Sequence, residues 1–270
     1  MLLGVIVGLA LATAGTVMQG FLRNPMADPS IIGVSAGATV GAVAFIISPI
    51  ASPFGLGLQA AAFSGGIVAA FVVYVIAIEN GRTPVATLLL AGIAIQTFLG
   101  AVISHMILRS GDSTEQAVHW FMGHLHNSTW TEVWLALPCV VGFYVLLHAY
   151  PRDLNVLPLG EEETESLGIP VQRTKRILLA ASSVITTAAF AVSGVIDFVG
   201  LIVQHMMQLL VGPDHRILLP TSALAGASFL VAMDTLARSG PMEVPVGIVT
   251  AARGAPFFLY LLRTREVHVL

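Results

Sequence analysis

The sequence is poor in charge. Only 10% of its 270 residues are Asp, Glu, Lys or Arg, and Lys175 is the single lysine. Soluble domains carry roughly 25% charged residues, so a water-soluble fold of this length would lack polar surface. The net charge of −3 and the shortage of lysine also leave no basic patch for binding nucleic acid.

Cysteine and nucleotide-binding motifs are scarce too. Cys139, in an apolar run, is the one cysteine, which excludes a disulfide framework and a cysteine-based metal site. The sequence contains no Gly-x-x-x-x-Gly-Lys-[Ser/Thr], so it cannot bind ATP in the P-loop manner. Glu161, Glu162 and Glu163 are consecutive and therefore diverge around a helix instead of pairing for acid–base chemistry. We expect neither an enzyme nor a cofactor.

Apolar residues are abundant: 56% of the chain is hydrophobic and the mean hydropathy is +0.88. Apolar stretches of about 20 residues recur along the whole length, which is the signal of transmembrane helices. The sequence therefore predicts an all-α polytopic membrane bundle, a single permease domain over residues 1–270, with about nine spans. The predicted spans are 1–21, 33–50, 57–78, 84–108, 130–149, 175–194, 199–211, 219–237 and 245–262.

The first and the seventh of these spans are unusual. Met1 opens directly into an apolar segment with no basic region before it, so we interpret the start as the first span and not as a secretory signal. The stretch 199–211 is short for a full crossing, which predicts a broken or tilted helix buried by its neighbours.

The distribution of basic residues predicts the orientation. If the first span runs from outside to inside, Arg109 and Arg238 lie outside and Arg253 falls within the last span. The basic residues on the inner side are then Arg23, Arg82, Arg152, Arg173, Lys175, Arg176, Arg216, Arg263 and Arg265. By the positive-inside rule, the loop at 151–174 and the C-terminus are cytoplasmic, and the loop at 110–129 is external.

Small residues recur at four-residue spacing in several spans. Gly4 with Gly8, and Gly33 with Gly37 and Gly41, each fall on one helix face. Small residues let helices approach closely in lipid, where burial of apolar surface gives no driving force. We interpret these positions mainly as packing contacts.

The stretch 157–170 is too polar to enter lipid. Residues 161–166 are expected to form one or two helical turns, with Gly160 before them and Leu167-Gly168 as a stop signal. A short acidic helix beneath a membrane bundle suits docking onto a soluble partner, and a solvated connecting loop is the alternative.

Histidines cluster on the predicted external loop at His119, His124 and His126. Imidazoles ligate haem iron and transition metals, but the two-residue spacing of His124 and His126 suits a loop or strand, not one helix face. Two interpretations stay open: external contact with substrate by His124 and His126, or ordinary interfacial polar residues. We predict no metal site.

Several motifs occur in a characteristic order. They are GTVMQGFLRNPMADPSIIGVSAGATVGAV, LLLAGIAI, HWFMGHLHNSTW, LNVLPLGEEETESLGI, FVGLIVQH, LVGPDHRILLP and EVPVGIVTAARGAPFFLYLL. In this series the chain resembles, over essentially its whole length, the FecCD family of ABC importer permeases. The resemblance implies a ten-span permease that moves an iron–siderophore, haem or cobalamin complex across the cytoplasmic (inner) membrane. It also implies a homodimer, two cytoplasmic ATPase subunits and an extracytoplasmic binding protein.

The resemblance implies roles for individual residues as well. Asn24 and Met26 match one part of a cytoplasmic gate, and Val85 and Ala86 match the other. Arg238 matches a basic residue that pairs with an acidic residue of the binding protein. The residues that match the loop coupling the permease to its ATPase are Gly160, Glu161, Glu162, Glu165, Ser166, Leu167 and Gly168.

The chain also departs from the family pattern. The family has a further span ahead of the position of Met1, so we expect an upstream segment. Gln204 replaces a proline, Gln208 stands near the usual arginine, Asp197 replaces a common glycine, and Arg253 lies in a normally apolar stretch. The rival function is a secondary transporter driven by an ion gradient, which usually carries acidic residues within its spans. Here most acidic residues fall in loops or at span ends, which disfavours that rival.

Overall fold

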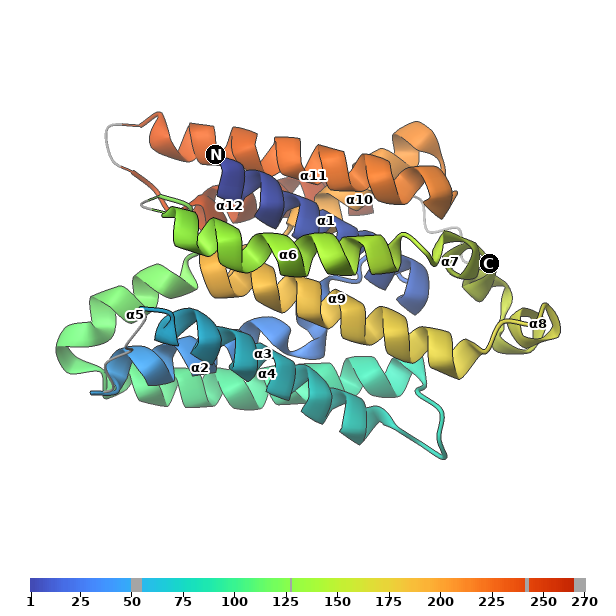
Figure 1. Ribbon diagram of the computed structural model, residues 1–270, viewed down its shortest axis with the longest axis horizontal. Helices are drawn as coiled ribbons and strands as arrows, with labels where there is room; N and C mark the ends of the chain where they lie inside the picture. The colour runs from blue at the N-terminus through green and yellow to red at the C-terminus, as the bar shows by residue number, and fades with distance from the viewer. Residues whose placement is uncertain (50–54, 127, 241–242, 265–270) are drawn as a thin grey trace.

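Long apolar helices lie side by side along the longest axis of the molecule (Figure 1). The computed structural model describes all residues except 50–54, 127, 241–242 and 265–270. Within the described part there is no strand, and the predicted all-α bundle is confirmed. The predicted cytoplasmic C-terminus, with Arg265, lies outside the described residues.

Twelve α-helices and three short 3₁₀ helices are described. The α-helices are α1 (Leu2–Leu22), α2 (Val34–Ile47), α3 (Gly57–Ala77), α4 (Val85–Leu108), α5 (Thr114–Phe121), α6 (Trp130–Leu147), α7 (Pro151–Val156), α8 (Glu161–Ser166), α9 (Val171–Ser193), α10 (Val199–Val211), α11 (His215–Arg238) and α12 (Val246–Thr264). The 3₁₀ helices are η1 (Pro29–Ile32), η2 (Gly111–Ser113) and η3 (Leu157–Leu159).

The long helices run between two ends, which we call the α5 end and the α8 end (Figure 1). Among the described residues, α1, α3, α4, α6, α9 and α11 are long and apolar enough to cross a membrane. The helices α2 and α10 are apolar but shorter. The short helix predicted at 199–211 is confirmed with the same bounds, but its neighbours bury only its first half, Val199–His205, and leave Leu209 and Leu210 exposed.

Two helices begin earlier than the hydropathy pattern predicts. The predicted span at 175–194 begins at Val171, because a helix continues through polar residues once it leaves the apolar region. The predicted span at 219–237 begins at His215, with Pro220 inside the helix instead of in the break before it. Proline is tolerated in membrane helices where neighbouring groups satisfy the freed carbonyl.

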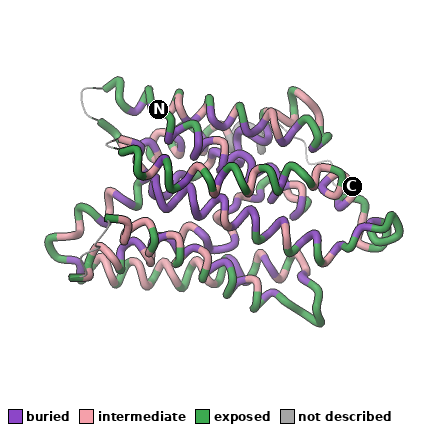
Figure 2. Tube along the Cα trace, viewed as in Figure 1, coloured by how far each residue is buried: buried purple, intermediate pink, exposed green. Residues whose placement is uncertain are grey.

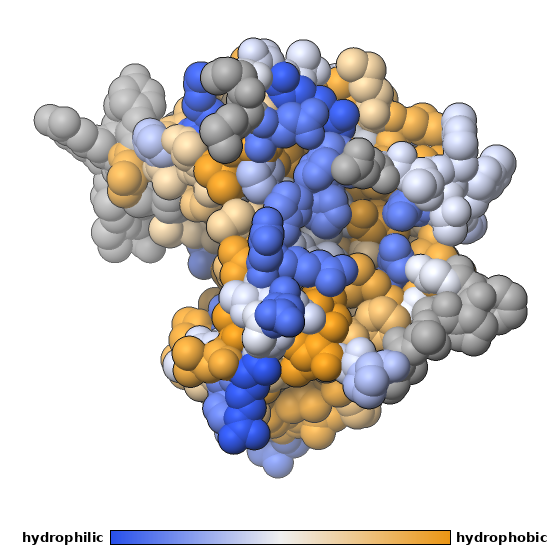
Figure 3. Space-filling view, turned by 90° about the vertical axis from the view of Figure 1, so that its left-hand side faces the viewer, coloured by the Kyte–Doolittle hydropathy of each residue, from blue (hydrophilic) through white to orange (hydrophobic). Residues whose placement is uncertain are grey.

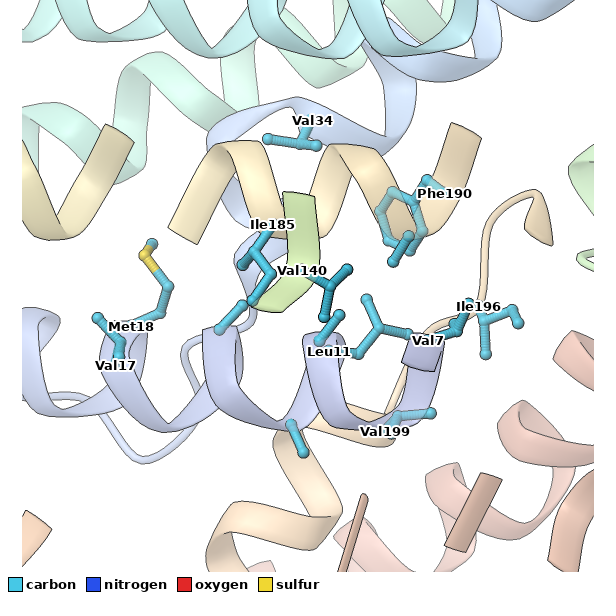
Figure 4. Packing of buried hydrophobic residues seen from close by; sticks show 14 of the residues in the cluster. Val7, Leu11, Val17, Met18, Val34, Val140, Ile185, Phe190, Ile196 and Val199 are labelled. Atoms are coloured by element: carbon cyan, nitrogen blue, oxygen red, sulfur yellow. The ribbon is translucent and has the colours of Figure 1, made fainter. Parts of the chain in front are cut away.

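The buried centre of the bundle is formed mainly by α1 and α9 (Figure 2). Val7 and Leu11 of α1 and Ile185 and Phe190 of α9 pack into one hydrophobic cluster, which Val140 of α6 joins (Figure 4). A helix that is apolar nearly all round, as α1 is, belongs in such a centre, whereas α9 also buries several Ser and Thr residues there. The outer helices instead expose large apolar side chains that lipid or another membrane chain would cover, including Phe71, Leu90, Phe98 and Leu210.

Glycines set the distance between α1 and its neighbours. A Cβ atom added to Gly8 would lie 2.3 Å from the carbonyl oxygen of Gly226 on α11. One added to Gly15 would lie 2.6 Å from the Cα atom of Gly200 on α10. The backbones of these helices are therefore in direct contact. The packing role inferred from the spacing of Gly4 and Gly8 is confirmed at Gly8.

We expect Gly8→Ala to destabilise the bundle, because the new methyl group meets backbone that cannot rotate away. Overpacking of this kind costs about 1–3 kcal/mol, and the measurement is the thermal unfolding temperature of the protein in detergent. Gly142→Ala on α6 is the matched control, since nothing lies within 4 Å of its added Cβ atom. Equal unfolding temperatures for the two variants would contradict the direct backbone contact.

Candidate functional site

The polar segment 151–170 lies beyond the bundle at the α8 end (Figure 1). It contains α7, η3 and α8, and the predicted helical turns at Glu161–Ser166 are confirmed. Gly160 precedes α8 with φ +135°, and Gly168 follows it with φ +81°. Both values favour glycine, so the two glycines fix where this short helix begins and ends.

One acidic residue of α8 faces inward. The Glu161 carboxylate pairs with the ammonium group of Lys175 on α9. The Lys175 side chain is buried. The Glu161 carboxylate also accepts a hydrogen bond from Nε2 of Gln172 at 3.1 Å. A buried ammonium group requires a partner of opposite charge, so this pair anchors α8 to the bundle. The exposed residues of the predicted coupling set are Glu162, Glu165, Ser166, Leu167 and Gly168.

Gln172 connects this anchor to the start of α4. Its Oε1 atom accepts a hydrogen bond from the backbone N–H of Thr83 at 3.3 Å. The amide orientation is fixed by its partners, because a carboxylate can only accept and an N–H can only donate. The connection runs from Glu161 through Gln172 to the turn that immediately precedes Val85 and Ala86.

A second connection joins α7 to the start of α11. Nδ2 of Asn155 donates to Oδ1 of Asp214 at 2.6 Å, and Oδ1 of Asn155 accepts from the backbone N–H of His215 at 2.9 Å. Asp214 also caps α11 by accepting from the backbone N–H of Arg216 at 3.0 Å. The pKa of the Asp214 carboxyl is held below its usual value, first by the hydrogen bond from Arg216 and then by that from Asn155.

The His215 side chain completes this connection. Its Nδ1 atom lies 2.8 Å from Oδ1 of Asn155, which is an acceptor, so Nδ1 carries the proton and Nε2 is an acceptor. Nε2 lies against Gly20 of α1, where an added Cβ atom would be 2.6 Å away. Gly20 therefore leaves the space that the imidazole occupies.

A polar cavity of about 630 Å³ opens between these elements at the α8 end. Its lining includes Gln19, Asn24, Gln204, Gln208 and His215. Gln204, at the position of the family proline, is buried and donates from Nε2 to Oε1 of Gln208 at 3.3 Å. Within the described part of the chain, neither polar atom of the buried Gln19 side chain has a hydrogen-bond partner. Such a cavity is suited to hold water.

The residues predicted to form a gate lie in two separate segments, one in a turn and one at the start of a helix. Asn24 and Met26 follow α1, where Oδ1 of Asn24 accepts from the backbone N–H of Met26 at 2.9 Å. Val85 and Ala86 are the first residues of α4. The Met26 side chain and Ala86 are exposed.

The other departures from the family pattern lie at the molecular surface. Asp197 is exposed and lines a pocket of about 320 Å³ together with Asp28 and Gln96. Arg253 is exposed on α12.

At the α5 end, hydrophilic residues form a band across the surface, with apolar residues on both sides (Figure 3). The predicted loop at 110–129 contains a helix, α5, which places His119 against His124 and His126. Burial is the main cause that lowers the pKa of His124 to about 4, and the two neighbouring histidines act in the same direction. The His124 imidazole is therefore neutral at pH 7.

Arg238 already has partners within the chain. Its Nε atom donates to Oδ1 of Asp234 at 3.0 Å, and its Nη2 atom lies 2.9 Å from Oδ2 of the same carboxylate. Nη2 also donates to the carbonyl oxygen of Leu125 at 3.1 Å. The guanidinium group thus connects the end of α11 to the loop between α5 and α6, which carries His124 and His126. Of the Arg238 side chain, 39% remains exposed.

Asn155, Gln172, Thr83 and Asp214 carry no sequence motif that predicts a role for their side chains. Each is a polar residue next to a helix end of an otherwise apolar chain, and that was the available signal. The identity of each partner could not be predicted, because Thr83 and Gln172 are 89 positions apart and Asn155 and Asp214 are 59 apart.

The chain is similar to known membrane permeases over nearly its whole length. A model of the FecCD transport family matches residues 1–264. The chain is 58% identical to the cobalamin import system permease protein BtuC of Halobacterium salinarum, covering 99% of this chain and 72% of that protein. It is 41% identical to the hemin transport system permease protein HmuU of Yersinia pestis, covering 98% and 81%. It is 37% identical to the Fe(3+) dicitrate transport system permease protein FecD of Escherichia coli K12, covering 97% and 82%.

A solved structure has the same fold. It is described as an inward-facing conformation of a metal-chelate type ABC transporter, and it superposes with a TM-score of 0.91 at 30% sequence identity. The alignment covers 98% of this chain and 84% of that one.

Proposed function

We propose, from the premise that the chain belongs to the FecCD transport family, that it is the membrane-spanning permease subunit of an ABC importer for a large metal chelate. The family match over residues 1–264 carries this proposal. The chain performs no covalent chemistry. It offers a path through the membrane, and its conformation changes with the state of a separate ATPase.

The proposed orientation places the α8 end in the cytoplasm, because Arg23 and Arg82 lie in turns at that end, Arg152 on the short helix α7 and Arg216 at the start of α11. Two cytoplasmic ATPase subunits would bind the exposed surface of α8 and its following turn. That surface is acidic at Glu162 and Glu165 and apolar at Leu167. A second copy of the permease would complete the transport path across the inner membrane.

Movement of the docked segment would reach the membrane helices through the two connections described above. Glu161 and Gln172 lead to the start of α4, where Val85 and Ala86 are proposed to form part of the cytoplasmic gate. Asn155 leads to α11 through Asp214. Asn24 and Met26 are proposed as the other part of the gate, beside the polar cavity.

Cobalamin is the substrate we favour among the metal chelates. The relative with 58% identity is a cobalamin permease, whereas the haemin permease is 41% identical and the ferric dicitrate permease 37%. Ferric siderophores and haem are the alternative substrates, and the uptake experiment below includes them. His124 and His126 are proposed to contact the substrate as it enters from the α5 end.

The test is uptake of labelled cobalamin, haem and a ferric siderophore by cells with and without this gene, together with co-purification of an ATPase subunit. We expect gene-dependent cobalamin uptake that stops when the ATPase is inactivated. Uptake of none of the three compounds would refute the proposal. So would uptake that persists without the ATPase and ceases when the ion gradient is dissipated.

Two substitutions separate docking from transmission. Gly168→Pro should abolish ATPase co-purification, because proline cannot adopt the positive φ of this turn and the docking surface changes shape. Gln172→Met should keep co-purification but slow uptake roughly tenfold, because it removes the two hydrogen bonds that lead to α4. Gln116→Met, which alters an exposed glutamine on α5 at the opposite end, is the matched control and should keep wild-type uptake. Wild-type uptake by the Gln172→Met variant would exclude this path.

Docking of the binding protein is proposed to involve Arg238, whose guanidinium group can pair with a partner carboxylate. Affinity should fall with salt, and Arg238→Glu should weaken docking more than Arg238→Ala because it adds like-charge repulsion. Asp234→Asn removes the internal competitor and should preserve or strengthen docking. The measurement is affinity of the loaded binding protein for the reconstituted transporter. Equal affinities for the wild type and both Arg238 variants would leave Arg238 with a role inside the chain only.

A further inference from the structure

Three imidazole rings meet at the α5 end, and they come from two different elements. His119 lies on α5, whereas His124 and His126 lie on the loop that precedes α6. The ring centroids are 5.4 Å apart for His119 and His124, 5.2 Å for His119 and His126, and 5.5 Å for His124 and His126. The three rings therefore form a nearly equilateral triangle.

This triangle has the size of a three-histidine metal site. With metal–nitrogen distances of about 2.0–2.1 Å and tetrahedral angles, the ring centres of three histidine ligands lie roughly 5 Å apart. The backbone thus already spaces the three side chains as ligands of one ion would be spaced. Side chains along the loop alternate in direction. Leu125 points into the bundle and is buried, so His124 and His126 on either side of it both lie close to His119.

The scaffold that carries the rings is fixed by contacts with the bundle. The backbone N–H of His124 donates to the carbonyl oxygen of Ser193 at 2.7 Å. Gly123 has φ +69°, and a Cβ atom there would lie 2.2 Å from the carbonyl oxygen of Val195. Trp120, next to His119, is buried. Little ordering of the backbone would be needed on binding, which favours affinity.

A nitrogen of the cluster is buried and unsatisfied. Nδ1 of His124 has no hydrogen-bond partner within the described part of the chain. A buried polar atom without a partner is unfavourable, and a metal ion would satisfy it. As the side chains lie, no group of three His, Cys, Asp or Glu among the described residues converges closely enough to hold an ion. Binding therefore requires the imidazoles to rotate about their Cβ–Cγ bonds, a soft torsion, so that one nitrogen of each ring faces the ion.

We propose that His119, His124 and His126 bind one divalent transition-metal ion, such as Zn²⁺, Ni²⁺ or Cu²⁺, at the α5 end. A set of three imidazoles suits these ions and not Mg²⁺ or Ca²⁺, which prefer oxygen ligands. The ion cross-links α5 to the loop whose Leu125 carbonyl holds Arg238. If Arg238 docks the binding protein as proposed above, a bound ion would hold the surface around Arg238 in one conformation and so strengthen docking. The metal site itself does not depend on that function.

The experiment uses the purified full chain in detergent, stripped of metal and carrying an affinity tag without histidine. Zn²⁺ is titrated by calorimetry and Co²⁺ by visible absorption. We expect one ion per chain and a loss of affinity of at least about tenfold for His119→Ala, His124→Ala or His126→Ala. His105→Ala and His148→Ala, which alter histidines outside the cluster, should bind as the wild type does.

A second measurement guards against variants that fold poorly. Zn²⁺ should raise the thermal unfolding temperature of the wild type, and Mg²⁺ should not. The rise should be absent in each cluster variant whose metal-free unfolding temperature equals that of the wild type. Absence of stoichiometric binding by the wild type would overturn the proposal, as would wild-type affinity in the His124→Ala variant. Neither readout involves transport, so failure here is distinct from failure of the proposed function.

Discussion

In the hydrocarbon core of a membrane, helices gain little by burying leucine against leucine, because lipid chains are equally apolar. Close contact between backbones must replace that driving force. Here α1 provides it through Gly8 against Gly226 and Gly15 against Gly200. The positions of α10 and α11 follow from these contacts, and so do those of the turns that connect them. A side chain at any of these glycines would force the paired helices apart at the contact.

The ion pairs of the described residues lie at the two ends of the bundle, where water can compensate charge. At the α8 end, the single lysine is buried and therefore requires the Glu161 carboxylate, which draws α8 against α9. One residue of an acidic helix is thus used for anchoring, and its neighbours remain exposed for a partner. The same anchor continues through Gln172 to α4, so attachment of the segment and transmission of its movement use the same side chains.

At the α5 end, too, a polar segment is attached to the bundle by a few specific contacts, here from an arginine and from the backbone. Arg238 holds the loop after α5 through the Leu125 carbonyl, and backbone hydrogen bonding fixes His124 to the end of α9. The loop is therefore positioned by a few directional contacts and not by an apolar core of its own. This explains how α5 and the loop after it can keep the centroids of three imidazole rings within 5.5 Å of one another.

Local properties of the sequence determined the helical bundle, the bounds of α10 and the short helix at Glu161–Ser166, because hydropathy and glycine signals act over a few residues. The starts of α9 and α11 were misplaced, since a helix continues past the end of its apolar stretch. Only the tertiary structure decided that Glu161 faces inward, that Asn155 meets Asp214, and that Arg238 reaches Leu125 across 113 positions. Such pairs depend on which helices pack together, and in lipid that choice rests on backbone fit between distant segments, which no local pattern contains.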